Sequence, residues 1–119
     1  MGFRKRHNYR NLKIWQLGLE IANEISDILE VFPKHERFDL SSQISKCSVS
    51  MPSNIAEGSA RTDKAFSTFL DYSLGSSFEL GTQLIAAFHA KYISERQFEK
   101  LNNKNNEFQR MIIGFMGKL

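Results

Sequence analysis

Positively charged side chains gather at the start of the chain. The first 13 residues hold five bases and no acid, a charge of +5, whereas the remaining residues hold 11 bases and 13 acids. The five bases are Arg4, Lys5, Arg6, Arg10 and Lys13. A short basic arm of this kind can attract phosphate groups by counterion release. The same charge also fits a solvated terminus that binds nothing.

A row of polar side chains lies in the middle of the chain. Gln43, Ser50, Asn54 and Glu57 are seven, four and three residues apart, which places them on one side of a helix. The row can be a hydrogen-bonded seam that fixes packing, with Ser50 or Asn54 bonding to carbonyls that Pro52 leaves free. It can also be a polar surface for a partner chain or a ligand.

The residue types that most often carry catalysis or hold metals are scattered. None of His7, His35 and His89 stands at metal-ligand spacing from a cysteine or a carboxylate. The single Cys47 has no nearby histidine, and it excludes an intramolecular disulfide or a multi-cysteine metal site. There is no phosphate-binding glycine loop. We therefore expect no enzymatic activity, no metal and no cofactor.

The apolar residues bear on the cellular compartment. No apolar run approaches the ~18 residues that span a membrane, and no apolar segment follows the basic start as in a secretory signal. Cys47 lies in an apolar stripe, where a small buried side chain in a reducing compartment is expected. These features predict a cytoplasmic protein with no membrane partner.

Four amphipathic segments must position these side chains. Apolar residues recur along them at intervals of three and four, the pattern of helices packed on one face. The predicted helices span residues 12–32, 39–60, 63–92 and 95–118. Pro33 ends the first, and Ser94 and Gln97 fit a capping box at the start of the last. With short connections and no strand pattern, the sequence predicts an all-α, antiparallel up-down four-helix bundle over residues 12–119, after a basic arm at residues 1–11.

The second predicted helix contains a proline. Its apolar stripe does not change face at Pro52, which favours one kinked helix. Two separate helices with Met51 as the boundary are the alternative. The stripe consists of Leu40, Ile44, Cys47, Met51 and Ile55.

Small and polar residues interrupt the later helices. Gly75 and Gly81 each cost ~1 kcal/mol against alanine, so we predict that another backbone approaches closely there. Gly58 is expected to soften the end of the second helix. Asn105 stands within the apolar seam of the last helix, where a polar residue usually fixes register or partner number.

Residues 50–58 form the most distinctive motif, Ser-Met-Pro-Ser-Asn-Ile-Ala-Glu-Gly. Its marked positions are Ser50, Pro52, Asn54, Glu57 and Gly58. Further matching segments are residues 11–16, 32–33, 38–44, 69–70, 75–76 and 79–80. In this order and spacing, the chain from Asn11 onward resembles the four-helix-bundle family of proteins encoded in intervening sequences of bacterial 23S ribosomal RNA genes.

The resemblance implies a left-handed antiparallel bundle that assembles into a homopentamer, with a role usually described as RNA-associated. The accessory protein of diversity-generating retroelements is a similar pentameric bundle whose partners are a reverse transcriptase and nucleic acid. This chain departs from the family pattern at Ser45, where a second basic residue usually precedes Lys46, and at Gly81, where a glutamate is usual. The first departure removes one positive charge from a possible nucleic-acid surface.

Two hypotheses on function follow. The first is an oligomeric bundle that binds structured RNA or a nucleoprotein complex, with Arg61 and Lys64 together at one end of the bundle. Its candidate nucleic-acid-binding residues are Arg4, Lys5, Arg6, Arg10, Lys13, Lys46, Arg61 and Lys64. The second is a protein–protein interaction scaffold with no nucleic acid partner, because the charges of residues 14–119 nearly balance.

Overall fold

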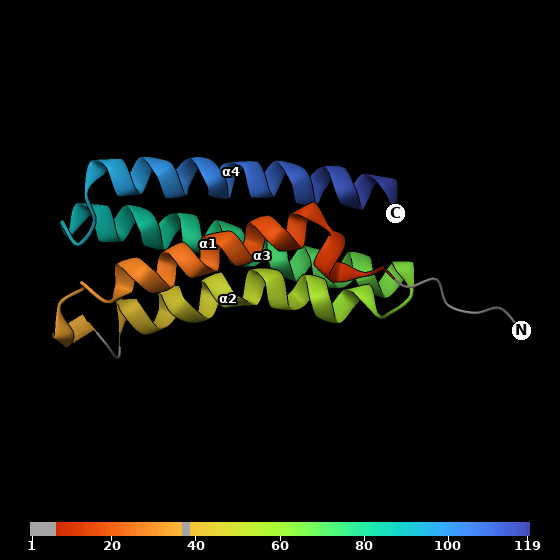
Figure 1. Ribbon diagram of the computed structural model, residues 1–119, viewed down its shortest axis with the longest axis horizontal. Helices are drawn as coiled ribbons and strands as arrows, with labels where there is room; N and C mark the ends of the chain where they lie inside the picture. The colour runs from red at the N-terminus through yellow and green to blue at the C-terminus, as the bar shows by residue number, and fades with distance from the viewer. Residues whose placement is uncertain (1–6, 37–38) are drawn as a thin grey trace, which may run out of the picture.

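The computed structural model describes residues 7–36 and 39–119, and they form a bundle of four helices packed side by side (Figure 1). The elements are η1 (Tyr9–Asn11), α1 (Lys13–Leu29), η2 (Lys34–Glu36), α2 (Leu40–Ser59), α3 (Asp63–His89) and α4 (Glu95–Lys118). Consecutive helices run in opposite directions, and the described residues contain no strand. The predicted all-α, antiparallel four-helix bundle is confirmed.

Two helices end about one turn earlier than the sequence predicts. The first, α1, ends at Leu29 rather than at residue 32, although Phe32 is still buried. The third, α3, ends at His89 because Lys91 adopts a left-handed φ of 64° and the Tyr92 N–H donates to the Ala87 carbonyl at 2.9 Å. This reverse bond closes the last turn of a helix.

At the start of α4 the predicted capping box is confirmed. The Gln97 N–H donates to Ser94 Oγ at 3.1 Å, and the Ser94 N–H donates to Gln97 Oε1 at 2.8 Å. Two backbone donors that the helix start leaves free are thereby satisfied.

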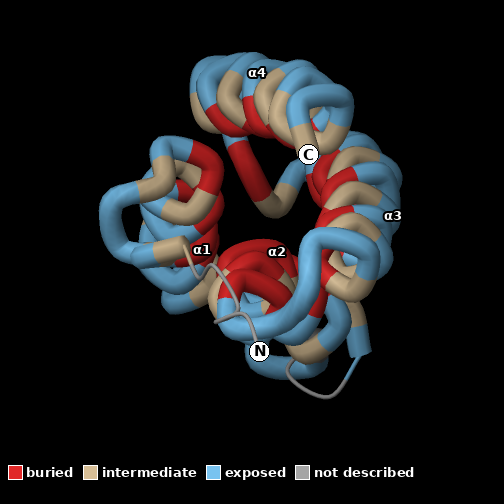
Figure 2. Tube along the Cα trace, turned by 90° about the vertical axis from the view of Figure 1, so that its right-hand side faces the viewer, coloured by how far each residue is buried: buried red, intermediate tan, exposed pale blue. Residues whose placement is uncertain are grey.

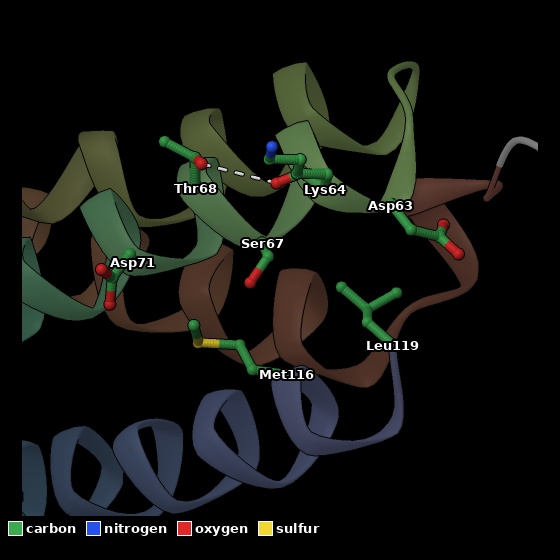
Figure 3. Close-up of a pocket in the computed structure, with 7 residues that line it drawn as sticks. All are labelled: Asp63, Lys64, Ser67, Thr68, Asp71, Met116 and Leu119. Carbon is green, nitrogen blue, oxygen red and sulfur yellow. Dashed lines mark hydrogen bonds between the residues drawn. The ribbon is translucent and has the colours of Figure 1, made fainter.

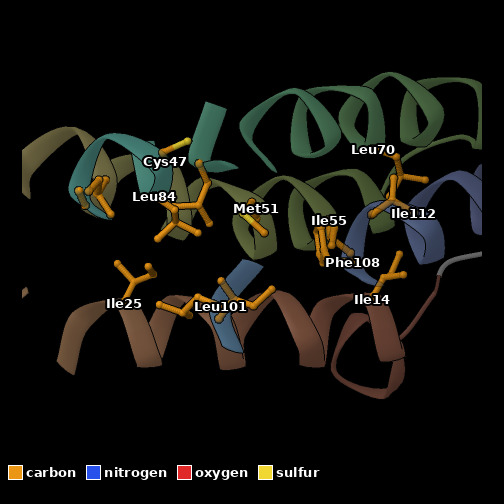
Figure 4. Close-up of a cluster of buried hydrophobic side chains, with 14 of the residues drawn as sticks. Ile14, Ile25, Cys47, Met51, Ile55, Leu70, Leu84, Leu101, Phe108 and Ile112 are labelled. Atoms are coloured by element: carbon orange, nitrogen blue, oxygen red, sulfur yellow. The ribbon is translucent and has the colours of Figure 1, made fainter. Parts of the chain in front are cut away.

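The buried residues of all four helices face a common core, as the end-on view shows (Figure 2). Ile44, Met51 and Ile55 of the predicted stripe are fully buried, and Cys47 is 6% exposed. They pack with isoleucines and leucines of the other helices and with Phe108 (Figure 4). The stripe therefore faces the core on both sides of Pro52.

All four helices meet at the proline of α2. The helix continues through Pro52, so the prediction of one helix rather than two is confirmed. A Cβ added at Gly18 of α1 would lie 3.4 Å from the Pro52 nitrogen and 3.1 Å from Phe108 Cε1 of α4. From α3, Ser73 Oγ donates to the Met51 carbonyl at 2.7 Å. Small residues on α1 and α3 let both helices approach this turn.

A buried polar pair joins α3 to α4. Ser77 Oγ donates to Asn105 Oδ1 at 2.6 Å, and Asn105 Nδ2 donates to the Ser77 carbonyl at 2.9 Å. Gln109 Nε2 also donates to Ser77 Oγ, at 3.1 Å. Because these bonds form at only one alignment of the two helices, Asn105 is placed to fix the register of α4 on α3.

Charged side chains link the outer edges of α1 and α4. Lys104 Nζ lies 2.9 Å from Glu20 Oε2 and also contacts Glu24 Oε1, and Lys100 Nζ lies 3.5 Å from the same Glu24 oxygen. The hydrogen bond to Glu24 raises the pKa of Lys104, with Glu20 adding to the shift against partial desolvation. This edge of the bundle is therefore held partly by charge and is sensitive to salt.

The expectation of close backbone approach at the glycines of α3 is wrong. A Cβ at Gly75 would meet nothing within 4 Å, and one at Gly81 would meet only Asn105 Nδ2, at 3.5 Å. The close approach is instead at Gly58, which is buried in the last turn of α2. A Cβ there would lie 2.7 Å from Phe69 Cβ and 2.8 Å from Phe66 Cδ1.

This contrast predicts opposite effects of one substitution at two sites. Gly58→Ala is expected to lower the free energy of unfolding, because overpacking costs ~1–3 kcal/mol and outweighs the ~1 kcal/mol gain in helix propensity. Gly75→Ala is expected to raise it by ~0.5–1 kcal/mol, because the new methyl group meets open space. Urea denaturation of both variants measures the two changes, and stabilisation by Gly58→Ala would contradict the packing described.

Candidate nucleic-acid interface

Four of the predicted basic residues lie at the same end of the bundle. Arg10 lies in η1 and Lys13 opens α1, while Arg61 follows α2 and Lys64 lies in the first turn of α3. Figure 1 shows that the start of α1, the end of α2 and the start of α3 share one end of the bundle. We call this the basic end. Arg4, Lys5 and Arg6 lie outside the described residues.

Lys46 does not join this group. It lies 13 residues before the end of α2 at Ser59, which is ~20 Å along the helix axis at 1.5 Å per residue. It lines a separate hollow of about 500 Å³ together with Lys34 and the serines of the first turns of α2. A single contact patch on one chain does not include it with the basic end.

Lys118, by contrast, belongs to the basic end and was missed from the sequence. It is the last residue of α4, and the C-terminus lies at this same end (Figure 1). The signal was present in the predicted topology, because the last helix of an up-down bundle finishes where the first one starts.

The segment before α1 is packed onto this end. The His7 N–H donates to the Ser59 carbonyl at 3.3 Å, and the His7 ring lies 5.2 Å from Phe66 and 5.8 Å from Phe115 between centroids. Gln16 Nε2 donates to the Arg10 carbonyl at 2.9 Å. Residues 7–11 of the predicted arm are therefore placed by contacts with the bundle, and they hold Arg10 beside the start of α1 and the end of α2.

Most cations of the basic end lack a carboxylate partner. Arg61 pairs with Glu57 at 3.5 Å, and both side chains are about half exposed, so the pair contributes little to stability. Arg10, Lys13, Lys64 and Lys118 form no ion pair with the residues that the structure describes. They are exposed and able to contact phosphate.

A hollow next to Lys64 is unsuited to phosphate. It has a volume of about 450 Å³ and lies between the start of α3 and the end of α4 (Figure 3). Its lining includes Lys64 but also the carboxylates of Asp63 and Asp71. Two negative charges against one positive charge repel an anion, so the contact surface at this end is formed by the exposed cations and not by the hollow.

Two of the four side chains in the polar row of α2 form hydrogen bonds within the bundle, and the other two are exposed. Ser50 Oγ lies 2.8 Å from the Cys47 carbonyl and 2.5 Å from Ser76 Oγ, and Asn54 Nδ2 donates to the Ser50 carbonyl at 2.9 Å. In a regular helix the Ser48 carbonyl would accept a hydrogen bond from the N–H of residue 52, which proline lacks. Neither Ser50 nor Asn54 donates a hydrogen bond to that carbonyl. Gln43 and Glu57 are exposed. Ser50 and Asn54 therefore serve the helix itself and its contact with α3.

The environment of Cys47 disfavours the reactive thiolate form of its side chain. Cys47 Sγ donates to the Ser76 carbonyl at 2.9 Å, and burial, with a smaller effect of Glu79, raises the pKa of the thiol to about 12. Nucleophilic chemistry needs the thiolate, which is scarce at neutral pH under these conditions. Within residues 7–36 and 39–119, no three histidine, cysteine or acidic side chains gather in a way that could hold a metal. None of the helices in that part of the chain has the length and apolar character needed to cross a membrane.

Comparison with known proteins gives a consistent match. The sequence model of the 23S rRNA-intervening sequence protein family matches residues 10–114. The crystal structure of a protein of unknown function from the S23 ribosomal protein family of Bacteroides thetaiotaomicron is similar with a TM-score of 0.80 and 24% sequence identity. The similarity covers 87% of this chain and 95% of that chain, and at this identity it shows the fold alone. No curated protein matches the chain.

The state of Cys47 predicts its reactivity. In the folded protein at pH 7.5, a disulfide reagent such as Ellman's reagent is expected to label the thiol only at the rate at which the bundle opens, because the side chain is buried and its pKa is high. In denaturant, labelling should be complete within the mixing time. Rapid labelling of the folded protein would show an accessible thiolate and contradict this environment.

Proposed function

Because the chain belongs to the 23S rRNA-intervening sequence protein family, we propose that it is a non-enzymatic bundle protein that associates with structured RNA or a nucleoprotein complex. The family resemblance seen in the sequence is confirmed by the match over residues 10–114. We further propose that it acts in the cytoplasm as an oligomer of identical copies, five by analogy with the family.

The observation that carries the RNA proposal is the set of unpaired cations at the basic end. Arg10, Lys13, Lys64 and Lys118 come from three helices and η1, and the fold brings them to one end. In the sequence, three more bases precede His7. Positive charge gathered on one face attracts nucleic acid, and repeating it in each copy of an oligomer multiplies the attraction.

Exposed apolar side chains support the oligomer proposal. Phe78 and Ile85 of α3 are 56% and 59% exposed, and Ile113 of α4 is 55% exposed. Phe78 and Ile85 are seven residues apart and share one side of their helix. Large apolar side chains that gather on one face are typical of contacts with another chain, whereas single scattered ones are common on any surface.

The same side chains keep a second function open. A scaffold that binds another protein, with no nucleic acid partner, would also use Phe78 and Ile85. It predicts that a single protein co-purifies at fixed stoichiometry without nucleic acid absorbance, and the two tests below separate it from the RNA proposal.

The first test is salt-dependent RNA binding, measured by fluorescence anisotropy with a labelled RNA hairpin. The wild-type protein is expected to bind at low salt, with an affinity that falls steeply as salt rises. Replacing the four unpaired cations of the basic end by alanine should weaken binding and flatten the salt slope by ~0.7–0.9 for each phosphate that the protein no longer neutralises. The variant carries Arg10→Ala, Lys13→Ala, Lys64→Ala and Lys118→Ala.

A charge-matched variant serves as the control. It removes four other cations without a described ion pair, Lys34, Lys46, Lys91 and Arg96, and should bind nearly as the wild type does. Equal losses of affinity in the two variants would show that net charge alone matters. Absence of binding at low salt would refute the RNA proposal itself.

The second test is the mass of the protein in solution. Light scattering coupled to size-exclusion chromatography is expected to give five copies of the 13.7 kDa chain. Phe78→Glu with Ile85→Glu should reduce this mass without loss of helical circular dichroism, because both side chains are exposed within one chain. A monomeric wild-type protein would rule out the oligomer and leave the bundle intact.

A further inference from the structure

Two arginines at the basic end lie over aromatic rings. The Arg61 Cζ atom is 4.8 Å from the centre of the Phe69 ring, and the Arg10 Cζ atom is 5.4 Å from the centre of the Tyr9 ring. Contacts at these distances hold a guanidinium group against an aromatic face. Neither arginine is therefore only a mobile charge, since each is already held near an aromatic surface.

Phe69, the ring that Arg61 contacts, also packs against the ring of an exposed tyrosine, Tyr72. The rings of Phe69 and Tyr72 meet edge to face, with centroids 5.7 Å apart and an angle of 81°. Phe69 packs tightly against Gly58 of α2, since a Cβ added at Gly58 would lie only 2.7 Å from Phe69 Cβ. This packing fixes the position of the Phe69 ring. Tyr72 is 57% exposed. Arg61, Phe69 and Tyr72 thus form a row with a rigid centre and an exposed aromatic ring, which we call the aromatic row.

The chemistry of this row matches unpaired bases. Every base presents a flat face that stacks on aromatic rings and guanidinium planes, and unpaired strands expose those faces. In a duplex the base faces are stacked on each other, and the deep, narrow major groove of A-form RNA does not admit side chains. A surface that read charge alone would need only the cations, not an exposed tyrosine beside them.

Other exposed apolar side chains lack this combination. Phe78 and Ile85 lie further along α3, and within the described residues no arginine stacks on Phe78. They fit a protein contact better than a base. Within the described residues, arginine lies over an aromatic ring only at the basic end, where the unpaired cations can hold the phosphates of the same strand.

We propose that the aromatic row binds an unpaired RNA segment, with a base stacked on Tyr72 and the backbone held by the neighbouring cations. This inference rests on the proposed RNA association and specifies which form of RNA the basic end accepts. The ligand is a single-stranded stretch, such as a loop or an end.

The experiment compares a short RNA strand that lacks self-complementarity with the duplex of that strand and its complement. A duplex of equal length carries twice the phosphates, so binding by charge alone favours the duplex. The wild-type protein is expected to bind the single strand more tightly in anisotropy titrations at one salt concentration. Tyr72→Ala should weaken single-strand binding about tenfold, the loss of one stacked base, and leave duplex binding within twofold.

Two matched variants complete the design. Tyr72→Phe keeps the ring and should bind the single strand as the wild type does. Val49→Ala removes a side chain of similar exposure from α2, away from the basic end and from the proposed oligomer contact, and should change neither affinity.

The possible failures are distinguishable. If the wild-type protein binds neither RNA, the inference and the proposed function both fall. If it binds the duplex at least as tightly, or if Tyr72→Ala binds the single strand like the wild type, the inference falls and the RNA association stands.

Discussion

The contact around Pro52 is the constraint on which the rest of the structure depends. A proline inside a helix removes a donor and presses on the preceding turn, at a cost of ~3 kcal/mol or more. Here the turn is buried between Gly18 of α1, Ser73 of α3 and Phe108 of α4. Larger side chains at positions 18 or 73 would push these helices apart. The residues that accommodate the proline therefore also set how closely the four helices pack.

Small polar residues maintain that close packing on the α3 side. The hydroxyl groups of Ser73 and Ser77 bond to the Met51 carbonyl and to Asn105, so the groups that enter the core have partners. A buried polar group without a partner costs ~1–3 kcal/mol, which makes a shifted alignment unfavourable. The register of α3 against α2 and α4 is thus specified by hydrogen bonds in addition to apolar burial. The up-down topology brings the end of α4, and with it Lys118, to the end of the bundle where α1 starts.

The sequence predicted the elements better than their contacts. Apolar periodicity and the Ser94 capping box are local signals, and they were sufficient for the bundle and for the start of α4. The end of α3 depends on the left-handed turn at Lys91, which no glycine marks. Gly58 and Gly75 look alike in sequence, yet only the packing of Phe66 and Phe69 distinguishes a crowded glycine from an open one.

The same division applies to the candidate site. The cluster of positive charge in the first residues can be read from the sequence. Lys118 and Tyr72 join the candidate site only because the fold brings α3 and α4 to the same end of the bundle. Lys46 was grouped with the basic residues by its charge, and its position along α2 separates it from them. Arg61 lies in the connection between α2 and α3, so its contact with Phe69 of α3 follows no spacing rule within one helix.

The most direct measurement of this account is native-state amide hydrogen exchange along α2 at increasing denaturant concentration. If the contacts at Pro52 hold α2 as one element, amides before the proline, such as Cys47, and after it, such as Ile55, will exchange with the same free energy, equal to that of global unfolding. Exchange of residues 53–59 through a separate opening of much lower free energy would show that the proline divides the helix, and would contradict the account.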